Sequence, residues 1–222
     1  MKRITEFGTA VLVSAVMFGC GTTAEQGEEP ADHQTERVLM VVPEDSSADL
    51  EYMLTMEVGV MRSLLEDAGI EVDVATGSGE PISAEHTTLT PELDYAAVDV
   101  AAYDGIVMPC LATADSARAL PPELAGIIQE FVAQGKPVAA QTGGIVALAS
   151  AGVLSGKKYA YMEDWVADVP QFEDAVHSGT GIVEDGNIIT SAVCPYAARM
   201  LELPDGTTQM TEALIAQLKD EG

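Results

Sequence analysis

The sequence predicts a single doubly wound α/β domain, in which helices cover both faces of a mostly parallel sheet. Short apolar runs bounded by Gly or Pro alternate along the chain with stretches of helical periodicity. The chain has 222 residues, 47% of them apolar, which is the size of one such domain with short appendages. Near residue 142 an apolar strand passes through a tight glycine turn into a helix of small residues. We therefore expect one core and one sheet.

The first part of the domain is predicted as strand, helix and strand. Residues 38–42 form a continuous apolar run that ends at Pro43, which is typical of a central parallel strand buried on both faces. Helical spacing of apolar residues over residues 50–68, followed by Gly69, predicts the first helix. The helix has one apolar line of Leu54, Met61 and Leu65, and a neighbouring line of Val60, Leu64 and Ala68. The alternation of Ile70, Val72 and Val74 predicts the second strand.

The same alternation continues to the end of the chain. A third strand ends at Pro109, Pro121 and Pro122 open a helix, and residues 137–140 form the next strand. The remaining predicted elements are a helix that ends at Gly152, a strand at residues 158–161, a hairpin around residues 184–186 and a last helix at residues 208–219. Together these elements predict a flavodoxin-like sandwich.

The turn after the strand at residues 137–140 has the sequence of a nucleophile elbow. Such an elbow needs a small residue, any residue, the nucleophile, any residue and then glycine, because the apex side chain leaves a strained turn at the start of a helix. Here these positions are Ala140, Gln141, Thr142, Gly143 and Gly144. The apex is therefore Thr142, whose hydroxyl is a weak nucleophile without a general base. The hydroxyl could instead cap the helix or bond a neighbouring backbone group.

Five segments, in the order of the DJ-1/PfpI (ThiJ) family, give the chain its resemblance to that family and to the related class I glutamine amidotransferase domains. The segments are RVLMVVPED, LLEDAGIEVDVAT, YDGIVMP, the elbow with SAGVLSGKK behind it, and VEDGNIITSAVCP. The resemblance covers Arg37 to about Leu218. It implies the flavodoxin-like fold, and it implies cysteine-dependent hydrolase, protease, glyoxalase or deglycase activities, or stress-linked chaperone roles. Many members are dimers, so the resemblance also implies a homodimer.

The resemblance assigns candidate roles to three positions. Thr142 stands where the family has its cysteine, and Gly143 replaces the histidine that usually follows it. Glu57 lies twelve residues before Gly69, the spacing of the family's site glutamate, and it shares the apolar face of its helix. A buried acid there would need a partner, which favours a functional role. Glu51 is the reserve candidate.

The third strand leads into Cys110 and Leu111, where the family has the Gly-Gly pair of its oxyanion hole. Cys110 is expected near Thr142, and Cys194, just before Pro195, is expected to approach from the other side. The two thiols could form a disulfide, Cys110 could be a displaced reactive thiol, or both could be small half-buried hydrophobic residues.

These replacements leave three functional hypotheses. The leading one is a domain that keeps the pocket but has lost the family's thiol chemistry, and that acts in binding or stress protection on a small-molecule or peptide ligand. The second is a divergent hydrolase or aldehyde-handling enzyme that uses Thr142 or Cys110 with support from Glu57. The third is a redox protein built on Cys110 and Cys194.

The N-terminal residues predict export. Lys2 and Arg3 precede an apolar run that reaches Gly19 and Cys20, which indicates a signal peptide over residues 1–19 with a lipidation site at Cys20. Residues 20–36 are polar and acidic and predict a disordered tether, and residues 37–220 form the domain. We therefore expect an exported protein that is lipid-anchored in the cell envelope and has no other membrane contact.

Composition excludes several classes of partner and cofactor. Ten Lys and Arg against 36 Asp and Glu give a net charge of −26, which argues against nucleic acid and fits adaptation to high salt. The three histidines lack ligand spacing and no Cys-x-x-Cys pair exists in the sequence, so we expect no metal site. The Gly-rich run at residues 77–79 lacks the dinucleotide fingerprint, and no cofactor is expected.

Overall fold

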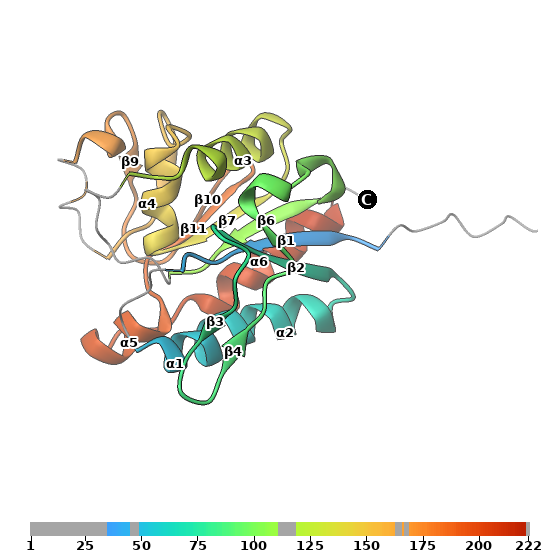
Figure 1. Cartoon of the computed structure of the whole chain (residues 1–222). Coiled ribbons are helices and arrows are strands. Elements are labelled where there is room, and N and C mark those ends of the chain that lie inside the picture. The colour runs from blue at the N-terminus through green and yellow to red at the C-terminus, as the bar shows by residue number, and fades with distance from the viewer. Residues whose placement is uncertain (1–34, 45–48, 111–118, 163–165, 167–168, 221–222) are drawn as a thin grey trace, which may run out of the picture. The chain divides into compact units, whose positions relative to one another are not determined.

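The computed structural model of the protein describes residues 35–44, 49–110, 119–162, 166 and 169–220. Its main sheet has seven strands in the order β10-β11-β7-β6-β1-β2-β5 (Figure 1). The strands are β1 (Arg37–Val41), β2 (Glu71–Thr76), β5 (Leu93–Asp94), β6 (Gly105–Met108), β7 (Val138–Gln141), β10 (Ile182–Asp185) and β11 (Ile188–Ser191). All neighbours pair in parallel except β10 and β11, which form the predicted hairpin. The doubly wound fold class is confirmed.

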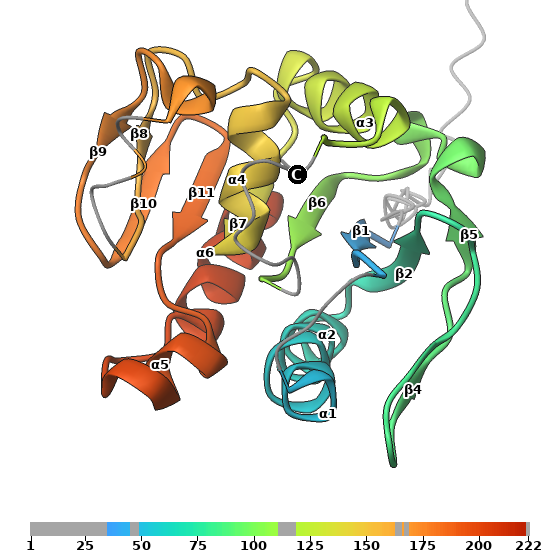
Figure 2. The ribbon, with the colours of Figure 1, turned by 60° about the vertical axis from the view of Figure 1, so that its left-hand side comes forward.

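Helices cover both faces of this sheet. The helices are α1 (Leu50–Met53), α2 (Gly59–Asp67), α3 (Pro122–Ala133), α4 (Gly143–Ser150), α5 (Pro195–Leu201) and α6 (Thr207–Asp220). Helices α3 and α4 lie on one face, and α2 and α6 lie against each other on the opposite face (Figures 1 and 2). No helix of the described ranges is long and apolar enough to cross a membrane.

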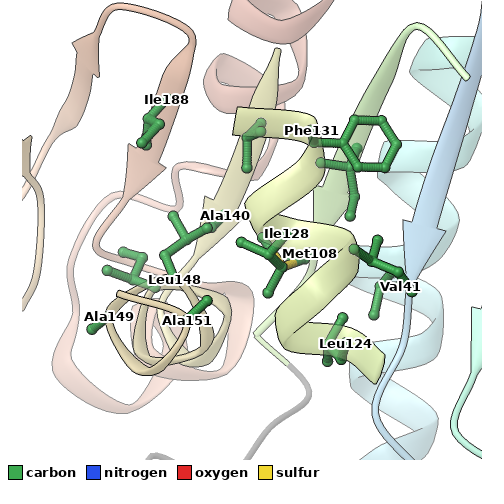
Figure 3. Close-up of a cluster of buried hydrophobic side chains, with 14 of the residues drawn as sticks. Val41, Met108, Leu124, Ile128, Phe131, Ala140, Leu148, Ala149, Ala151 and Ile188 are labelled. Atoms are coloured by element: carbon green, nitrogen blue, oxygen red, sulfur yellow. The ribbon is translucent and has the colours of Figure 1, made fainter. Parts of the chain in front are cut away.

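The central strand β1 explains why the sheet needs cover on both sides. Val38 and Met40 pack into the core under α2 and α6, whereas Leu39 and Val41 point into the core under α3 and α4. Figure 3 shows part of the second core, where Leu124, Ile128 and Phe131 of α3 lie close to strand residues such as Val41 and Met108. Since side chains alternate across a strand, an all-apolar run is the expected sequence of such a strand.

The predicted first helix is interrupted by a π-helical turn, Leu54–Val58, between α1 and α2. Leu54, Met61 and Leu65 are buried as predicted. The neighbouring apolar line, which includes Val60 and Leu64, is half-buried at the border of this face. A π turn inserts an extra residue into the helix and thereby rotates the buried face.

Two short strand pairs lie outside the main sheet. The strand predicted at residues 158–161 is only β8 (Lys158–Tyr159), and it pairs with β9 (Val176–His177) instead of extending the main sheet. The loop before residue 90 contains an unpredicted hairpin of β3 (Ile82–Ser83) and β4 (Thr88–Leu89). The Glu51 carboxylate anchors this hairpin by accepting hydrogen bonds from the backbone N–H groups of His86, at 2.8 Å, and Thr87, at 3.2 Å.

Candidate functional site

Three neighbouring strands deliver the candidate residues to one edge of the sheet. Strands β6, β7 and β11 are adjacent and parallel, with Met108 paired to Ala140 and Ser191 paired to Gln141. Cys110, Thr142 and Cys194 follow directly after these strand ends. In open α/β sheets, sites form at the carboxyl ends of the strands. The expected proximity of Cys110, Thr142 and Cys194 is confirmed.

The turn at Thr142 has the strained backbone of an elbow. Thr142 has φ 42° and ψ −96°, a region that β-branched residues rarely adopt. A Cβ at Gly144 would lie 2.5 Å from the Met108 carbonyl oxygen, so only glycine lets α4 approach the end of β6 so closely. The elbow motif therefore corresponds to an elbow conformation, although its apex carries no thiol.

The Thr142 side chain is not placed as a nucleophile. It is 3% exposed, and its Oγ1 donates a hydrogen bond to the carbonyl oxygen of Ala192 at 3.0 Å. It does not cap α4, so that interpretation was wrong, and the alternative of a bond to a neighbouring backbone group was right. Among the described residues no histidine or carboxylate side chain forms a hydrogen bond with the hydroxyl.

Glu57 lies in the π-helical turn, with its side chain fully buried. Its Oε1 accepts a hydrogen bond from the backbone N–H of Cys110 at 2.7 Å, while Oε2 has no hydrogen-bond partner within the described ranges. Burial, and next the charge of Cys194, raise the pKa of this carboxyl well above its usual range. The inward orientation predicted for Glu57 is confirmed, and Glu51, which binds the β3–β4 hairpin, is not its substitute.

Cys110 and Cys194 are both free thiols, and their side chains interact directly. A hydrogen bond from Cys110 lowers the pKa of Cys194 to about 6, with help from the N–H groups of Ala197 and Tyr196 and from the Thr142 hydroxyl, and against the effect of burial. The same contact with Cys194, together with burial, raises the pKa of Cys110, although the Gly143 N–H opposes the shift. The contact between the two thiols therefore favours the ionised form of Cys194 and the protonated form of Cys110.

The two cysteine residues differ in their overall exposure. Cys194 is 2% exposed and stands immediately before α5, whereas Cys110 is only partly buried. Pro195 is buried in the first turn of α5. Leu111, the predicted partner of Cys110 in the altered oxyanion loop, lies outside the described residues, as does Cys20. Within the described ranges, no three His, Cys, Asp or Glu side chains gather as metal ligands.

A buried polar network beside the thiols was not predicted. Gln141 Nε2 donates to the carbonyl oxygen of Val193 at 2.8 Å and to Ser191 Oγ at 3.2 Å, and Gln141 Oε1 accepts from Thr207 Oγ1 at 3.1 Å. The sequence does contain one signal of it, since Gln141 is a polar residue at the end of an otherwise apolar strand. A polar residue at such a position needs buried partners.

The comparisons with known proteins agree with this geometry. The DJ-1/PfpI family pattern matches residues 36–202. The chain belongs to the DJ-1/PfpI family. An uncharacterized protein of Archaeoglobus fulgidus is 30% identical over 156 residues, which are 69% of this chain and 87% of the relative.

Solved structures of family members share the fold. A ThiJ/PfpI domain protein from Brachyspira murdochii has a TM-score of 0.63 at 19% identity, over 84% of this chain and 98% of that protein. A two-domain protein from Anabaena variabilis, with DJ-1/ThiJ/PfpI-like and ferritin-like domains, also gives 0.63 at 20% identity, over 83% of this chain. The match spans only 48% of that longer protein, so it concerns one of its domains.

Proposed function

We propose that this DJ-1/PfpI domain is a thiol-based stress-protection protein whose Cys110 and Cys194 form a redox-active pair that reduces small hydroperoxides. The single observation that carries the proposal is the direct contact of two free thiols at the carboxyl edge of the sheet, beside the buried Glu57. The elbow supplies no sulfur. The pair therefore takes over the reactive role.

The proposed reaction has two balanced steps. The Cys194 thiolate attacks one oxygen of the hydroperoxide, the O–O bond breaks, and the departing alkoxide or hydroxide takes a proton from the Glu57 carboxyl. Cys194 becomes a sulfenic acid. Cys110 then loses its proton and attacks the Cys194 sulfur, the S–O bond breaks, and hydroxide leaves with that proton as water. The products are an alcohol or water, a second water molecule and a disulfide, which an external dithiol reduces.

Glu57 and the backbone of Gly143 support these roles. Burial raises the pKa of the Glu57 carboxyl well above its usual range and so favours the protonated form, which can give a proton to a leaving oxygen anion. The Gly143 N–H donates toward the Cys110 sulfur and favours its anion at the moment of attack. Because Cys194 is 2% exposed, we expect hydrogen peroxide to react faster than bulky hydroperoxides.

The test uses the reduced full chain with Cys20→Ser, in high salt, so that only two thiols remain. One equivalent of hydrogen peroxide should consume both thiols and yield an intramolecular disulfide, seen as a mass loss of two hydrogens. Cys110→Ala should stop at a sulfenic acid that dimedone traps on Cys194. Cys194→Ala should leave Cys110 unmodified over the same time. Retention of both free thiols in the folded parent protein would overturn the proposal.

A second candidate function is carbonyl chemistry, favoured by the unpartnered Oε2 of Glu57 beside the sulfurs. Cys194 would attack the carbonyl carbon, and the oxygen would take the Glu57 proton to give a hemithioacetal. Turnover of methylglyoxal or an ester by the parent protein, lost in Cys194→Ala and retained in Cys110→Ala, would select this function. Loss in Thr142→Ala alone would indicate the elbow hydroxyl instead.

We also propose that the protein is exported and anchored through a lipid on Cys20. The support is the basic and apolar character of residues 1–19 and the Gly19-Cys20 pair. An oxidising compartment would suit a pair that cycles through a disulfide. Fractionation should find the protein with membranes, and Cys20→Ser should release it. Equal distribution of the two forms would argue against the anchor.

A further inference from the structure

The last residues of β7 and the elbow bind the segment that carries Cys194. Three consecutive carbonyl groups precede Cys194, and each accepts a hydrogen bond from Gln141 or Thr142. Ser191 O accepts from the Thr142 N–H at 2.9 Å and Ala192 O accepts from Thr142 Oγ1 at 3.0 Å. Val193 O accepts from Gln141 Nε2 at 2.8 Å. The position of Cys194 is therefore set by the elbow.

This arrangement requires a strained backbone at Thr142. A φ of 42° at a β-branched residue costs about 1–3 kcal/mol and persists only where the surroundings enforce it. A strand residue with ordinary φ would point its hydroxyl elsewhere, because the side chain direction follows the backbone. The strained apex thus directs a hydroxyl to the Cys194 segment, away from solvent.

We propose that Thr142 is a positioning residue, whose hydroxyl holds the Cys194 segment in place and donates to the Cys194 sulfur when this sulfur is ionised. The inference rests on the proposed function, since it names the group that serves the reactive sulfur of that pair. The hydroxyl has one hydrogen. It donates to Ala192 O while Cys194 is neutral, and it turns to Sγ when Cys194 is a thiolate.

The electrostatics of the site agree with this geometry. The Thr142 hydroxyl is among the groups that lower the pKa of Cys194, after Cys110 and the Ala197 N–H. Other groups that face this sulfur are the N–H of Tyr196 and the carboxyl of Glu57. The Thr142 hydroxyl belongs to a side chain of the elbow. Substitution of Thr142 therefore separates its effect on the pKa of Cys194 from the effects of the other groups.

The test compares Thr142→Gly, Thr142→Ser and Thr211→Val in the reduced Cys20→Ser chain. Glycine adopts positive φ without strain, so Thr142→Gly should fold while lacking the hydroxyl. The Thr211 hydroxyl bonds Thr207 O inside α6, at 2.8 Å, and serves as the control for loss of a buried hydroxyl. Iodoacetamide labelling of Cys194, followed by peptide mass spectrometry, measures the thiolate fraction against pH.

We expect Thr142→Gly to move the midpoint of the labelling curve to higher pH and to slow labelling at about pH 6 by about tenfold. Thr142→Ser and Thr211→Val should keep the parent midpoint. An unchanged midpoint in folded Thr142→Gly would overturn the inference. A shifted midpoint in a protein that does not consume peroxide would leave the role of Thr142 standing and reject the proposed function. If all variants consumed peroxide at equal rates, the proposed function would stand and the role of Thr142 would be rejected.

Discussion

Two strand-to-helix turns lie side by side at the same edge of the sheet. One has the strained backbone of a nucleophile elbow, and the other carries the reactive sulfur. The β7–α4 turn has the strained backbone, with Thr142 at φ 42°, but it carries a hydroxyl that donates a hydrogen bond to a carbonyl group. The β11–α5 turn has an ordinary backbone, with Cys194 at φ −83°, and it carries a sulfur with a lowered pKa. Elbow geometry and thiol chemistry are separated here.

This difference shows that an elbow can serve as a support, in the sense that it positions the neighbouring turn and does not carry the nucleophile itself. The elbow brings α4 against β6 through Gly144 and orients donors toward the neighbouring turn. Reactivity then depends on the polar hydrogens around the sulfur, which come from Cys110, from the N–H groups of the second turn and from the Thr142 hydroxyl. If this view is right, damage to the first turn should disturb the whole edge, and damage to the second turn should change only the chemistry.

The largest expected effect comes from Gly144→Ala. The new Cβ would lie 2.5 Å from the Met108 carbonyl oxygen, so α4 or β6 must move. We expect a loss of about 3 kcal/mol in the free energy of unfolding. The control is Gly126→Ala in the middle of α3, where a Cβ meets no atom within 4 Å. It should gain about 0.5–1 kcal/mol.

Chemical denaturation in constant high salt measures both variants. An equal response of the two glycines would mean that the close approach of α4 to β6 is not required. In that case the elbow would not be the support that holds the edge together.

A second expected effect concerns the pH dependence of stability. The pKa of Glu57 is raised in the folded protein, so the folded state holds this proton at pH values where the unfolded state has lost it. Its contribution to stability is therefore full below pH 4.5, the ordinary value, and decreases as pH rises toward the folded pKa. Within that window the slope is at most about 1.4 kcal/mol per pH unit.

Glu57→Gln should remove this slope, so the free energy of unfolding of the variant should decline less than that of the parent as pH rises above 4.5. Glu51→Gln is the matched control from the same helical segment. A hydrogen bond from Thr87 is the main cause that lowers the pKa of Glu51, so its contribution is lost as pH falls. Parallel curves for the parent and Glu57→Gln would show that the buried carboxyl is not held protonated.

Apolar patterning was sufficient to predict the inner strands of the sheet because these are buried on both faces, whereas the short edge strand β5, which is only half-buried, was not predicted. Val38–Val42 could be recognised for this reason, and Glu57 was predicted as a buried acid from its place on an apolar helical face. The π-helical turn Leu54–Val58 had no signal, since the apolar pattern over residues 50–68 is that of an ordinary helix. The lowered pKa of Cys194 was likewise unpredictable, because it depends on the contact with Cys110 and on N–H groups of α5, which only the fold brings to this sulfur.

The smallest expected effect comes from the network that links the two turns. Thr207 Oγ1 lies 3.1 Å from Gln141 Oε1 and 2.7 Å from Asp205 Oδ1, and Gln141 in turn binds Val193 O. Thr207→Val should leave a buried acceptor without a donor and cost about 1 kcal/mol. Thr211→Val, which removes a hydroxyl bonded within the same helix, should cost less than about 0.5 kcal/mol.

Labelling of Cys194 separates a structural from a functional role of this network. Thr207 is bonded to Gln141 and not to the sulfur, so Thr207→Val should slow labelling by less than Thr142→Gly does. The order of these two effects follows from their distance to the reactive atom along the hydrogen-bond chain. A reversed order would mean that Gln141, more than Thr142, sets the position of Cys194, and the support would then come from the strand end and not from the elbow apex.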